Sequence, residues 1–276
     1  MALTVNSNMA ATNAVTYVQR TSRSLQASFG RISSGLRISR AADDAAGLGV
    51  AENLSAIAQG LRQAMRNTND GVSLIEVAES ATSEVANIIK RMRELAVQSA
   101  SETLENTERN YIQTEFLELT AEVDRIASVS EFNGVLLADA SITTLSVQVG
   151  VNNGAGDSIA ITLGDLRAAT LAVDTASVNL STAANASASL TGLDAALDIV
   201  NGYRASYGAT TNRLESAMKN LETYTEKLEG AESRIRDADF AYESSEMSKY
   251  QIMQQAGLAV LAQANQLNQG VLKLLG

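Results

Sequence analysis

The side chains that carry most protein chemistry are either absent from this sequence or lack the pattern that such chemistry needs. The chain contains no histidine and no cysteine, so it lacks the usual general base, the commonest metal ligand and the thiolate nucleophile. Serine is abundant, but no Gly-x-Ser-x-Gly elbow occurs, and a serine–lysine pair would need a pocket that narrow helical rods rarely supply. We therefore expect no catalytic residues, no metal site and no cofactor, and a structural protein rather than an enzyme.

Two further stretches of the sequence contain residue types that occur in calcium-binding or phosphate-binding sites, but they lack the spacing or the neighbouring elements of such sites. The carboxylates between Glu115 and Asp124 fall on the polar side of an amphipathic helix, and no Asp-x-Asp-x-Asp-Gly calcium loop is present. The run Asn-Asn-Gly-Ala-Gly-Asp at 152–157 lacks the lysine and the strand-to-helix setting of a phosphate loop. Solvated acids and an ordinary turn are the better interpretations.

The composition is typical of long helices packed side by side. Hydrophobic residues make up 45% of the 276 residues, yet aromatics are only 4% and there is no proline or tryptophan. No run of 18 apolar residues occurs, so we expect no membrane span.

Charge is unevenly distributed along the chain. Residues 1–40 hold five arginines and no acid, and the charges of residues 241–276 balance, so residues 41–240 carry a charge of −15 within the net charge of −10. An acidic middle argues against nucleic acid as a partner.

Both ends of the chain carry apolar residues at helical spacing. From residue 15 the gaps alternate between three and four, which predicts a heptad seam and therefore a partner helix. That partner lies either elsewhere in the chain, as in an ordinary bundle, or in another subunit. The N-terminal seam comprises Val15, Val18, Ser22, Leu25, Phe29, Ile32 and Leu36, and the C-terminal stripe comprises Met253, Ala256, Val260, Ala264, Leu267 and Val271.

Between these ends we expect three more helices. The first begins at the caps Asp43 and Asp44 and runs without a break to about Ser99, so about 55 residues would reach roughly 80 Å. The second follows a bend, with Asn106 or Thr107 as its N-cap, and the third begins near Thr191. Short connections between them predict antiparallel neighbours.

The region before the last long helix changes its period. Apolar and polar residues alternate on both sides of a Gly/Asn turn within 142–164, which predicts a β-hairpin. Residues 168–190 are mostly Ala, Ser, Thr and Asn, and we expect them to form an exposed surface excursion. The predicted fold is mainly α, a long antiparallel helical bundle or coiled coil with one β-hairpin, divided into 1–42, 43–235 and 236–276.

Several motifs, in one order along the chain, resemble those of bacterial flagellin. They cover about 30–135 and 190–274, and nothing but common ancestry explains so many in one order. The N-terminal motifs are Ile32-Ser-Ser-Gly-Leu-Arg-Ile, Asp43-Asp-Ala-Ala-Gly-Leu, Arg66-Asn-Thr-Asn-Asp-Gly-Val-Ser, Arg91-Met-Arg-Glu-Leu-Ala-Val-Gln-Ser and Glu131-Phe-Asn-Gly. The C-terminal motifs are Ser233-Arg-Ile-Arg-Asp-Ala-Asp-Phe, Ile252-Met-Gln-Gln-Ala-Gly and Val260-Leu-Ala-Gln-Ala-Asn-Gln.

The resemblance implies a structural subunit that polymerises with itself into the extracellular flagellar filament for motility. It implies type III export without a cleaved signal peptide, and partners in the filament cap, the hook-associated proteins and an export chaperone. Residues 1–42 and 236–276 would pair as a coiled coil lining the filament's inner tube, largely disordered in the free monomer. The inner-tube packing residues would be Val15, Val18, Leu25, Phe29, Ile32, Leu36, Met253, Val260, Leu267 and Val271. Because only a short stretch separates the two blocks, the family's variable outer domains are expected to be absent.

The resemblance also implies a surface for the flagellin-sensing Toll-like receptor of animals. The matching positions are Arg91, Leu95 and Glu115, and the spacing of Arg91 and Leu95 places them on one helical face. The same residues could instead serve ordinary axial contacts between subunits. Two other functions remain open at this point: the hook–filament junction protein, which shares the terminal architecture, and a helical adhesin or binding module.

Overall fold

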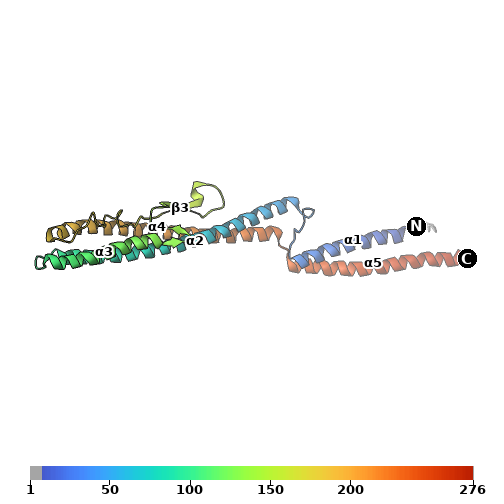
Figure 1. Cartoon of the computed structure of the whole chain (residues 1–276). Coiled ribbons are helices and arrows are strands. Elements are labelled where there is room, and N and C mark those ends of the chain that lie inside the picture. The colour runs from blue at the N-terminus through green and yellow to red at the C-terminus, as the bar shows by residue number, and fades with distance from the viewer. Residues whose placement is uncertain (1–7, 276) are drawn as a thin grey trace. The chain divides into compact units, whose positions relative to one another are not determined.

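A computed structural model describes the backbone of residues 8–275 and the side chains of residues 8–266. The described chain forms five α-helices (Figure 1): α1 (Met9–Ser34), α2 (Ala45–Ser99), α3 (Asn106–Val129), α4 (Ala183–Arg236) and α5 (Phe240–Leu275). Two short antiparallel strand pairs, β1 (Glu131–Phe132) with β2 (Val135–Leu136) and β3 (Thr144–Gln148) with β4 (Ser158–Thr162), complete it. The expected mainly α class with long helices is confirmed.

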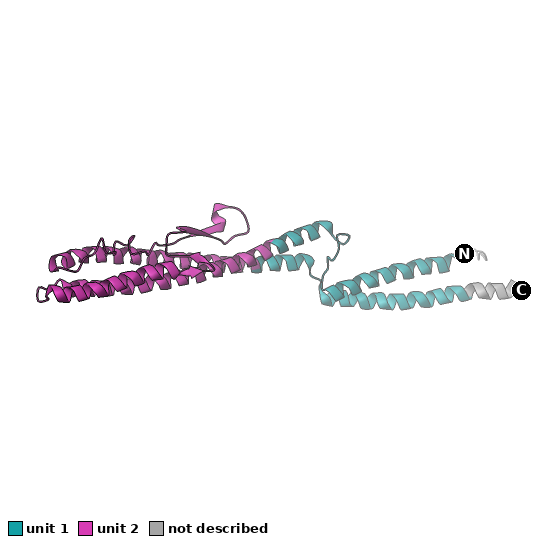
Figure 2. Ribbon diagram, in the orientation of Figure 1, with its two compact units in different colours: residues 1–56, 226–276 teal, residues 57–225 magenta. Residues whose placement is uncertain are grey.

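The chain divides into two compact units (Figure 2). Residues 1–56 and 226–276 form unit 1, and residues 57–225 form unit 2. The long helices α2 and α4 contribute to both units. The finer division at residues 42 and 235 that the sequence suggests stays a prediction.

Unit 2 is a bundle of α2, α3 and α4 in which α3 and α4 run opposite to α2 (Figure 1). Each helix contributes one apolar stripe to a common core, as the helical period of the sequence requires. The core side chains that are at most 1% exposed include Val85, Ile89, Met92 and Leu95 of α2, Phe116 and Val123 of α3, and Leu193 and Val200 of α4.

Helix α2 is continuous over 55 residues, as expected, through the sequence Asn69-Asp70-Gly71. A glycine inside a helix costs about 1 kcal/mol of stability relative to alanine. At position 71 the β3–β4 hairpin packs so close to α2 that a larger residue would not fit, because a Cβ at Gly71 would lie 3.0 Å from Cγ2 of Val147. Gly60 has the same role, with Cγ1 of Val151 at 2.8 Å from its added Cβ.

Arg109 fixes the bend between α2 and α3. Its side chain is buried, and its guanidinium donates to the carbonyls of Ser99 at 2.9 Å and Ser101 at 2.7 Å. The third bond goes to Oδ1 of Asn106 at 3.1 Å. The N-cap of α3 is Glu105, one residue before the expected position, and its backbone N–H donates to Oε2 of Glu108. An arginine thus satisfies carbonyls that the end of α2 leaves without helical partners.

The β3–β4 hairpin forms in the expected place, with Val147 opposite Ile159 and Leu145 opposite Ile161. Its inward side packs on α2 and α4 around Leu74, Ile75, Tyr207 and Leu214. The β1–β2 pair was not expected, because strands of two residues cannot show an alternating pattern. It turns at Asn133 and Gly134, with φ of 51° and 78°, the left-handed geometry that Asn-Gly favours.

The return segment, residues 165–182, is not the exposed excursion that its composition suggested; that prediction was wrong. Its scattered apolar side chains are buried in the core of unit 2, and its backbone is bonded to α2 and α3. The buried side chains are Leu166, Ala168, Leu171, Val173, Val178 and Leu180. These residues are too far apart in a background of Ala, Ser and Thr to produce a helical or strand period. The following helix therefore begins at residue 183, earlier than the expected 191.

Polar side chains of the bundle hold the backbone of the return segment. Asp124 accepts the N–H of Ala168 at 2.8 Å, and Gln113 accepts the N–H of Leu180 at 2.6 Å. The Ser99 hydroxyl donates to the Leu180 carbonyl at 2.6 Å. Buried backbone groups outside regular structure need such partners, so these bonds let an irregular segment enter the core.

Asp165 closes the start of the return segment. Its carboxylate accepts two hydrogen bonds from the Arg167 guanidinium, at 2.9 and 2.7 Å, and one from the Thr170 hydroxyl at 2.6 Å. The hydrogen bonds from Arg167 and then Thr170 outweigh the cost of burial, and they lower the pKa of Asp165 to about 2. The charged form is therefore the one that the folded segment binds.

Replacing Leu171 by alanine should destabilise unit 2, because this side chain is only 1% exposed. We expect Leu171→Ala to lower the free energy of unfolding by about 2–5 kcal/mol, measured by urea unfolding with far-ultraviolet circular dichroism. Leu117→Ala on the exposed side of α3 is the matched control and should cost much less. Equal effects would contradict a buried return segment.

Stability should fall at low pH through Asp165. Its folded pKa of about 2 is below the ordinary 3.8, so its contribution is complete above about pH 4 and lost as the pH falls toward about 2. We expect Asp165→Asn to cost about 1–2 kcal/mol at neutral pH and to show a smaller loss of stability between pH 4 and 2. Asp198→Asn, an exposed control, should leave the profile unchanged; a similar change in both variants would refute the assignment.

Candidate self-assembly surface

Helix α1 has well-defined ends within unit 1. Asn8 is its N-cap, with Oδ1 accepting the N–H of Ala11 at 3.0 Å. Gly35 ends it in the left-handed region, at φ 71°, and donates its N–H to the carbonyl of Arg31. Glycine is the residue that adopts this conformation at no cost, so the chain turns sharply here.

The connections into and out of the terminal helices are tied together. The N–H of Arg37 donates to the carbonyl of Arg236 at 2.7 Å, and the N–H of Ala238 donates to the carbonyl of Gly35 at 2.9 Å. Asp239 then caps α5 through the N–H of Ala241 at 2.9 Å. These bonds hold the end of α1 beside the start of α5.

Helices α1 and α5 lie side by side in opposite directions (Figure 1), and small side chains fill the seam between them. The buried seam positions are Thr21 and Ser28 of α1 and Gly257 and Ala264 of α5, each pair seven residues apart. A Cβ at Gly257 would lie 2.7 Å from Cγ2 of Val18, so glycine is required for this approach. The seam has the expected heptad spacing but is built from small residues.

The structure separates the predicted inner-tube residues into two groups. Val18, Leu25, Ile32, Leu36 and Met253 are half-buried. Val15, Phe29 and Val260 are exposed, at 39%, 64% and 59%. The side chains of Leu267 and Val271 lie outside the described residues. One half of the predicted N-terminal seam is thus displaced by one position, because Thr21 and Ser28 face α5 where Ser22 and Phe29 were expected.

This arrangement leaves large apolar side chains on the outside of the α1–α5 pair. We call them the exposed apolar set: Met9, Val15, Tyr17, Phe29, Phe240, Tyr242, Ile252, Leu258 and Val260. Scattered apolar residues are normal on a protein surface, but a concentration of them along two paired helices marks an interaction surface.

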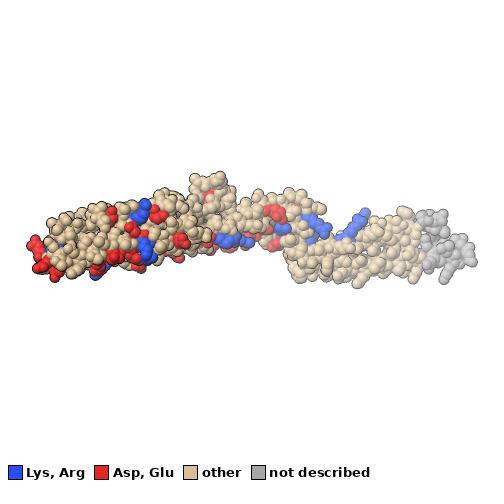
Figure 3. Space-filling view, viewed as in Figure 1, with Lys and Arg blue, Asp and Glu red and all other residues tan. Residues whose placement is uncertain are grey.

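The charge distribution agrees with that interpretation (Figure 3). On the visible face of unit 2, side chains of both signs are interspersed, whereas the α1–α5 pair shows mostly uncharged side chains and one basic cluster. Charged residues are depleted at the core of protein interfaces, so the terminal helices have the character of an interface.

One partly buried ion pair joins the terminal helices. Nη1 of Arg31 lies 3.0 Å from Oε1 of Glu243; Glu243 is buried, whereas the Arg31 side chain is 35% exposed. Sequence reasoning missed this pair, because the two residues lie more than 200 positions apart in the sequence and neither belongs to an apolar stripe. A pair of this kind favours one register of the two helices over others.

The three candidate receptor residues are not equivalent in the structure. Nη2 of Arg91 lies 2.7 Å from Oε1 of Glu115, and both side chains are about half exposed. The hydrogen bonds that Arg91 donates to Glu115, and then to Glu94, raise the pKa of its guanidinium. The Leu95 side chain is 1% exposed and belongs to the core of unit 2. The expected exposed face therefore consists of Arg91 and Glu115, with Leu95 packed beneath it.

The described residues contain no group of three or more acidic side chains that could hold a metal ion. None of the helices in the same part of the chain combines the length and hydropathy that crossing a membrane requires.

Comparison with known proteins identifies both halves of the chain. The bacterial flagellin N-terminal helical region matches residues 5–143, and the bacterial flagellin C-terminal helical region matches residues 190–275. The flagellin of Halalkalibacterium halodurans is 42% identical, and the match covers 98% of this chain and 99% of that protein. The flagellar filament 33 kDa core protein of Treponema phagedenis is 40% identical, with the same coverage.

A solved structure agrees with the fold. The crystal structure of Bacillus cereus flagellin is 31% identical, covers 56% of this chain and 88% of that chain, and superposes with a TM-score of 0.50. The flagellin of Bacillus subtilis is 38% identical, with coverage of 98% of this chain and 99% of that protein.

Fold and matches together define a helical structural subunit that assembles with copies of itself. The chain belongs to the bacterial flagellin family. It is a short flagellin, since residues 144–189, between the two matched regions, hold only the β3–β4 hairpin, the return segment and the start of α4. Its function is to form the extracellular flagellar filament of bacterial motility. Neither the junction-protein nor the adhesin alternative gains support from these comparisons.

Proposed function

We propose that the α1–α5 pair is the part of the subunit that the filament buries, as its inner tube. The observation that carries this proposal is the exposed apolar set, which includes Phe29 at 64% and Val260 at 59% exposure. The predicted packing residues that α5 does not cover within one subunit, Val15 and Phe29, are then covered by neighbouring subunits. Val18, Leu25, Ile32, Leu36 and Met253 serve both the seam and its surroundings.

Burial in the polymer also accounts for the weak seam. Fixing the backbone of one residue costs about 1–2 kcal/mol in conformational entropy. The buried side chains Thr21, Ser28 and Ala264 are small, so their burial in the seam contributes little free energy to offset that cost. Burying a large apolar side chain contributes about 1.5–3 kcal/mol. The terminal helices therefore gain most of their stability on assembly, which limits polymerisation before the subunit reaches the growing filament.

The same coupling fits the finer expectations about the subunit's route and partners. A chain without disulfides and with weakly held ends suits export in an unfolded state without a cleaved signal peptide. The exposed apolar set would need cover before assembly, which an export chaperone supplies, and the cap and hook-associated proteins would meet the same helices at the filament ends. Membership of the flagellin family supports these expectations about export and partners.

Polar substitutions in the exposed apolar set should impair polymerisation without unfolding the subunit. We expect Phe29→Ser with Val260→Ser to raise the critical concentration for seeded filament growth about tenfold or more, since each change removes about 1.5–3 kcal/mol of burial. Negative-stain electron microscopy and sedimentation measure it. Unfolding of unit 2 by urea should be unchanged.

Tyr111→Ser is the matched control, because Tyr111 is 73% exposed and lies on α3. It should polymerise at the wild-type concentration. The proposal fails if the double variant also grows filaments at that concentration.

We also propose that the Arg91–Glu115 pair is read by the flagellin-sensing Toll-like receptor of animals. Both side chains are about half exposed and form an ion pair in which Nε and Nη2 of Arg91 lie 3.0 and 2.7 Å from one carboxylate oxygen, Oε1 of Glu115. A preformed pair can offer a receptor both charges without further ordering. Leu95 is buried in the core of unit 2 and anchors the part of α2 that carries Arg91.

Removing the pair should reduce receptor signalling. We expect Arg91→Ala with Glu115→Ala to lower the potency of the soluble monomer in a receptor reporter assay by about tenfold or more, the loss typical of a hot spot. The control is Glu122→Ala with Arg125→Ala, which removes another exposed pair, 2.6 Å long, on α3. Wild-type potency of the Arg91 and Glu115 variant would exclude this surface.

A further inference from the structure

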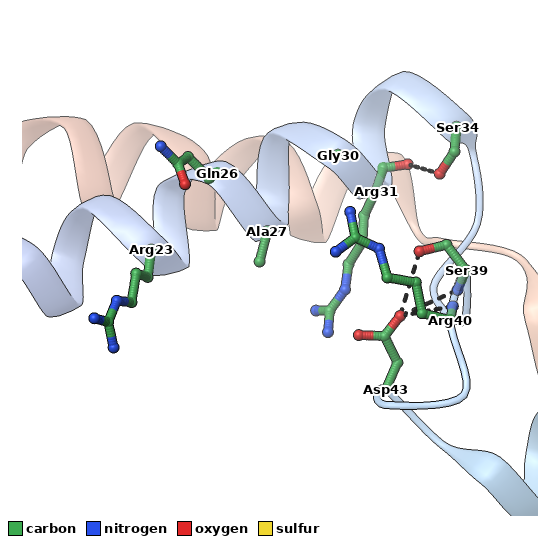
Figure 4. A pocket seen from close by; sticks show the side chains of 9 residues that line it. All are labelled: Arg23, Gln26, Ala27, Gly30, Arg31, Ser34, Ser39, Arg40 and Asp43. Carbon is green, nitrogen blue, oxygen red and sulfur yellow. Dashed lines mark hydrogen bonds between the residues drawn. The ribbon is translucent and has the colours of Figure 1, made fainter.

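A cavity at the end of α1 is lined by three arginines, of which only Arg31 forms an ion pair with a described residue. Arg23 and Arg31 project from α1, and Arg40 reaches it from the loop that follows (Figure 4). Gly30 and Ala27 form part of the same wall and leave the space between the long side chains open. Three guanidinium groups therefore border one cavity within unit 1.

The carboxylates near this cavity are already engaged. Glu243 is held by Arg31 at 3.0 Å. Oδ2 of Asp43 accepts the backbone N–H groups of Ser39 and Arg40 at 3.2 and 3.1 Å, bonds that also lower the pKa of its carboxyl group. Arg23 and Arg40 form no ion pair with any described residue. The positive charges around the cavity therefore exceed the negative charges that lie near it.

The backbone of the loop that carries Arg40 is held in place by hydrogen bonds at both of its ends. The left-handed turn at Gly35 reverses the chain, and the bond from Arg37 N–H to the Arg236 carbonyl fixes the first residues after it. The Ser39 and Arg40 bonds to Asp43 close the loop. Guanidinium groups bind carboxylates well, because the geometries of the two groups match.

The acids that could fill the cavity lie elsewhere in the sequence. Residues 1–40 contain no acid, while the whole excess of acid falls in residues 41–240. On unit 2, Glu76, Glu84, Glu118 and Glu215 are exposed and form no ion pair with a described residue. Since the subunit polymerises, a second copy of the chain is a source of such carboxylates.

We propose that this cavity binds a carboxylate of residues 57–225 in a second copy of the chain, and that Arg23 and Arg40 are the residues that receive it. The contact adds a polar, salt-sensitive interaction to filament assembly. It rests on the self-assembly of the subunit and not on the burial of the exposed apolar set, so the two proposals can fail separately.

A zero-length cross-link tests which carboxylate enters the cavity. The wild-type chain has no lysine before Lys90, so Arg23→Lys and Arg40→Lys each place one unique amine there while keeping the charge. A carbodiimide activates a touching carboxylate, the lysine amine forms the amide, and the carbodiimide leaves as its urea. Filaments grown from an equal mixture of ordinary and isotope-labelled subunits distinguish links between copies from links within one copy.

The expected result is a mixed-isotope peptide pair that joins residue 23 or 40 to an acid of residues 57–225, in filaments and not in monomers. Arg20→Lys is the matched control, since Arg20 is an exposed arginine of α1 outside the cavity. Links only to Asp43 or Glu243, links equally frequent in monomers, or equal mixed links from the control would overturn the proposal.

Polymerisation gives a second, independent measurement. We expect Arg23→Gln with Arg40→Gln to raise the critical concentration about threefold to tenfold over Arg20→Gln at about 50 mM sodium chloride. That ratio should fall toward one at about 500 mM, where screening is strong. A ratio of one at both concentrations, or a raised ratio that salt does not change, would refute a carboxylate contact.

Discussion

The close approach of α1 and α5 is the constraint on which the architecture of unit 1 depends. Two helices can come this near only where side chains are small, so Thr21, Ser28, Gly257 and Ala264 occupy the seam. The large apolar residues of the same helices then have no place inside the pair and remain on its outside. This outer apolar surface is the one that we propose other copies of the subunit cover in the filament.

Unit 2 follows the opposite rule. Its core side chains, Phe116 and Tyr207 among them, are buried, and its irregular segments are bonded to the bundle. Most of its charged residues lie on its surface, where several form exposed pairs such as Arg93 with Asp194 at 2.6 Å. One chain thus combines a bundle that has its own buried core with a pair of terminal helices that we propose for contact between copies.

Strong periodicity made much of this fold predictable, while isolated side chains did not. The continuous α2, the β3–β4 hairpin and the Asn133–Gly134 turn all have local signals in the sequence. The return segment was missed because Leu171 and Leu180 are buried without any regular spacing, and the Arg31–Glu243 pair because it depends on two distant residues meeting. Phe29 was placed on the correct helix, but which face meets α5 depends on steric fit and not on hydrophobicity alone.

The uninterrupted helices α2 and α4 have a kinetic consequence. They run through 55 and 54 residues because the chain contains no proline. A chain without proline avoids the cis–trans isomerisation that delays folding by tens to hundreds of seconds at 25 °C. Folding of each newly delivered subunit is therefore free of this slow step.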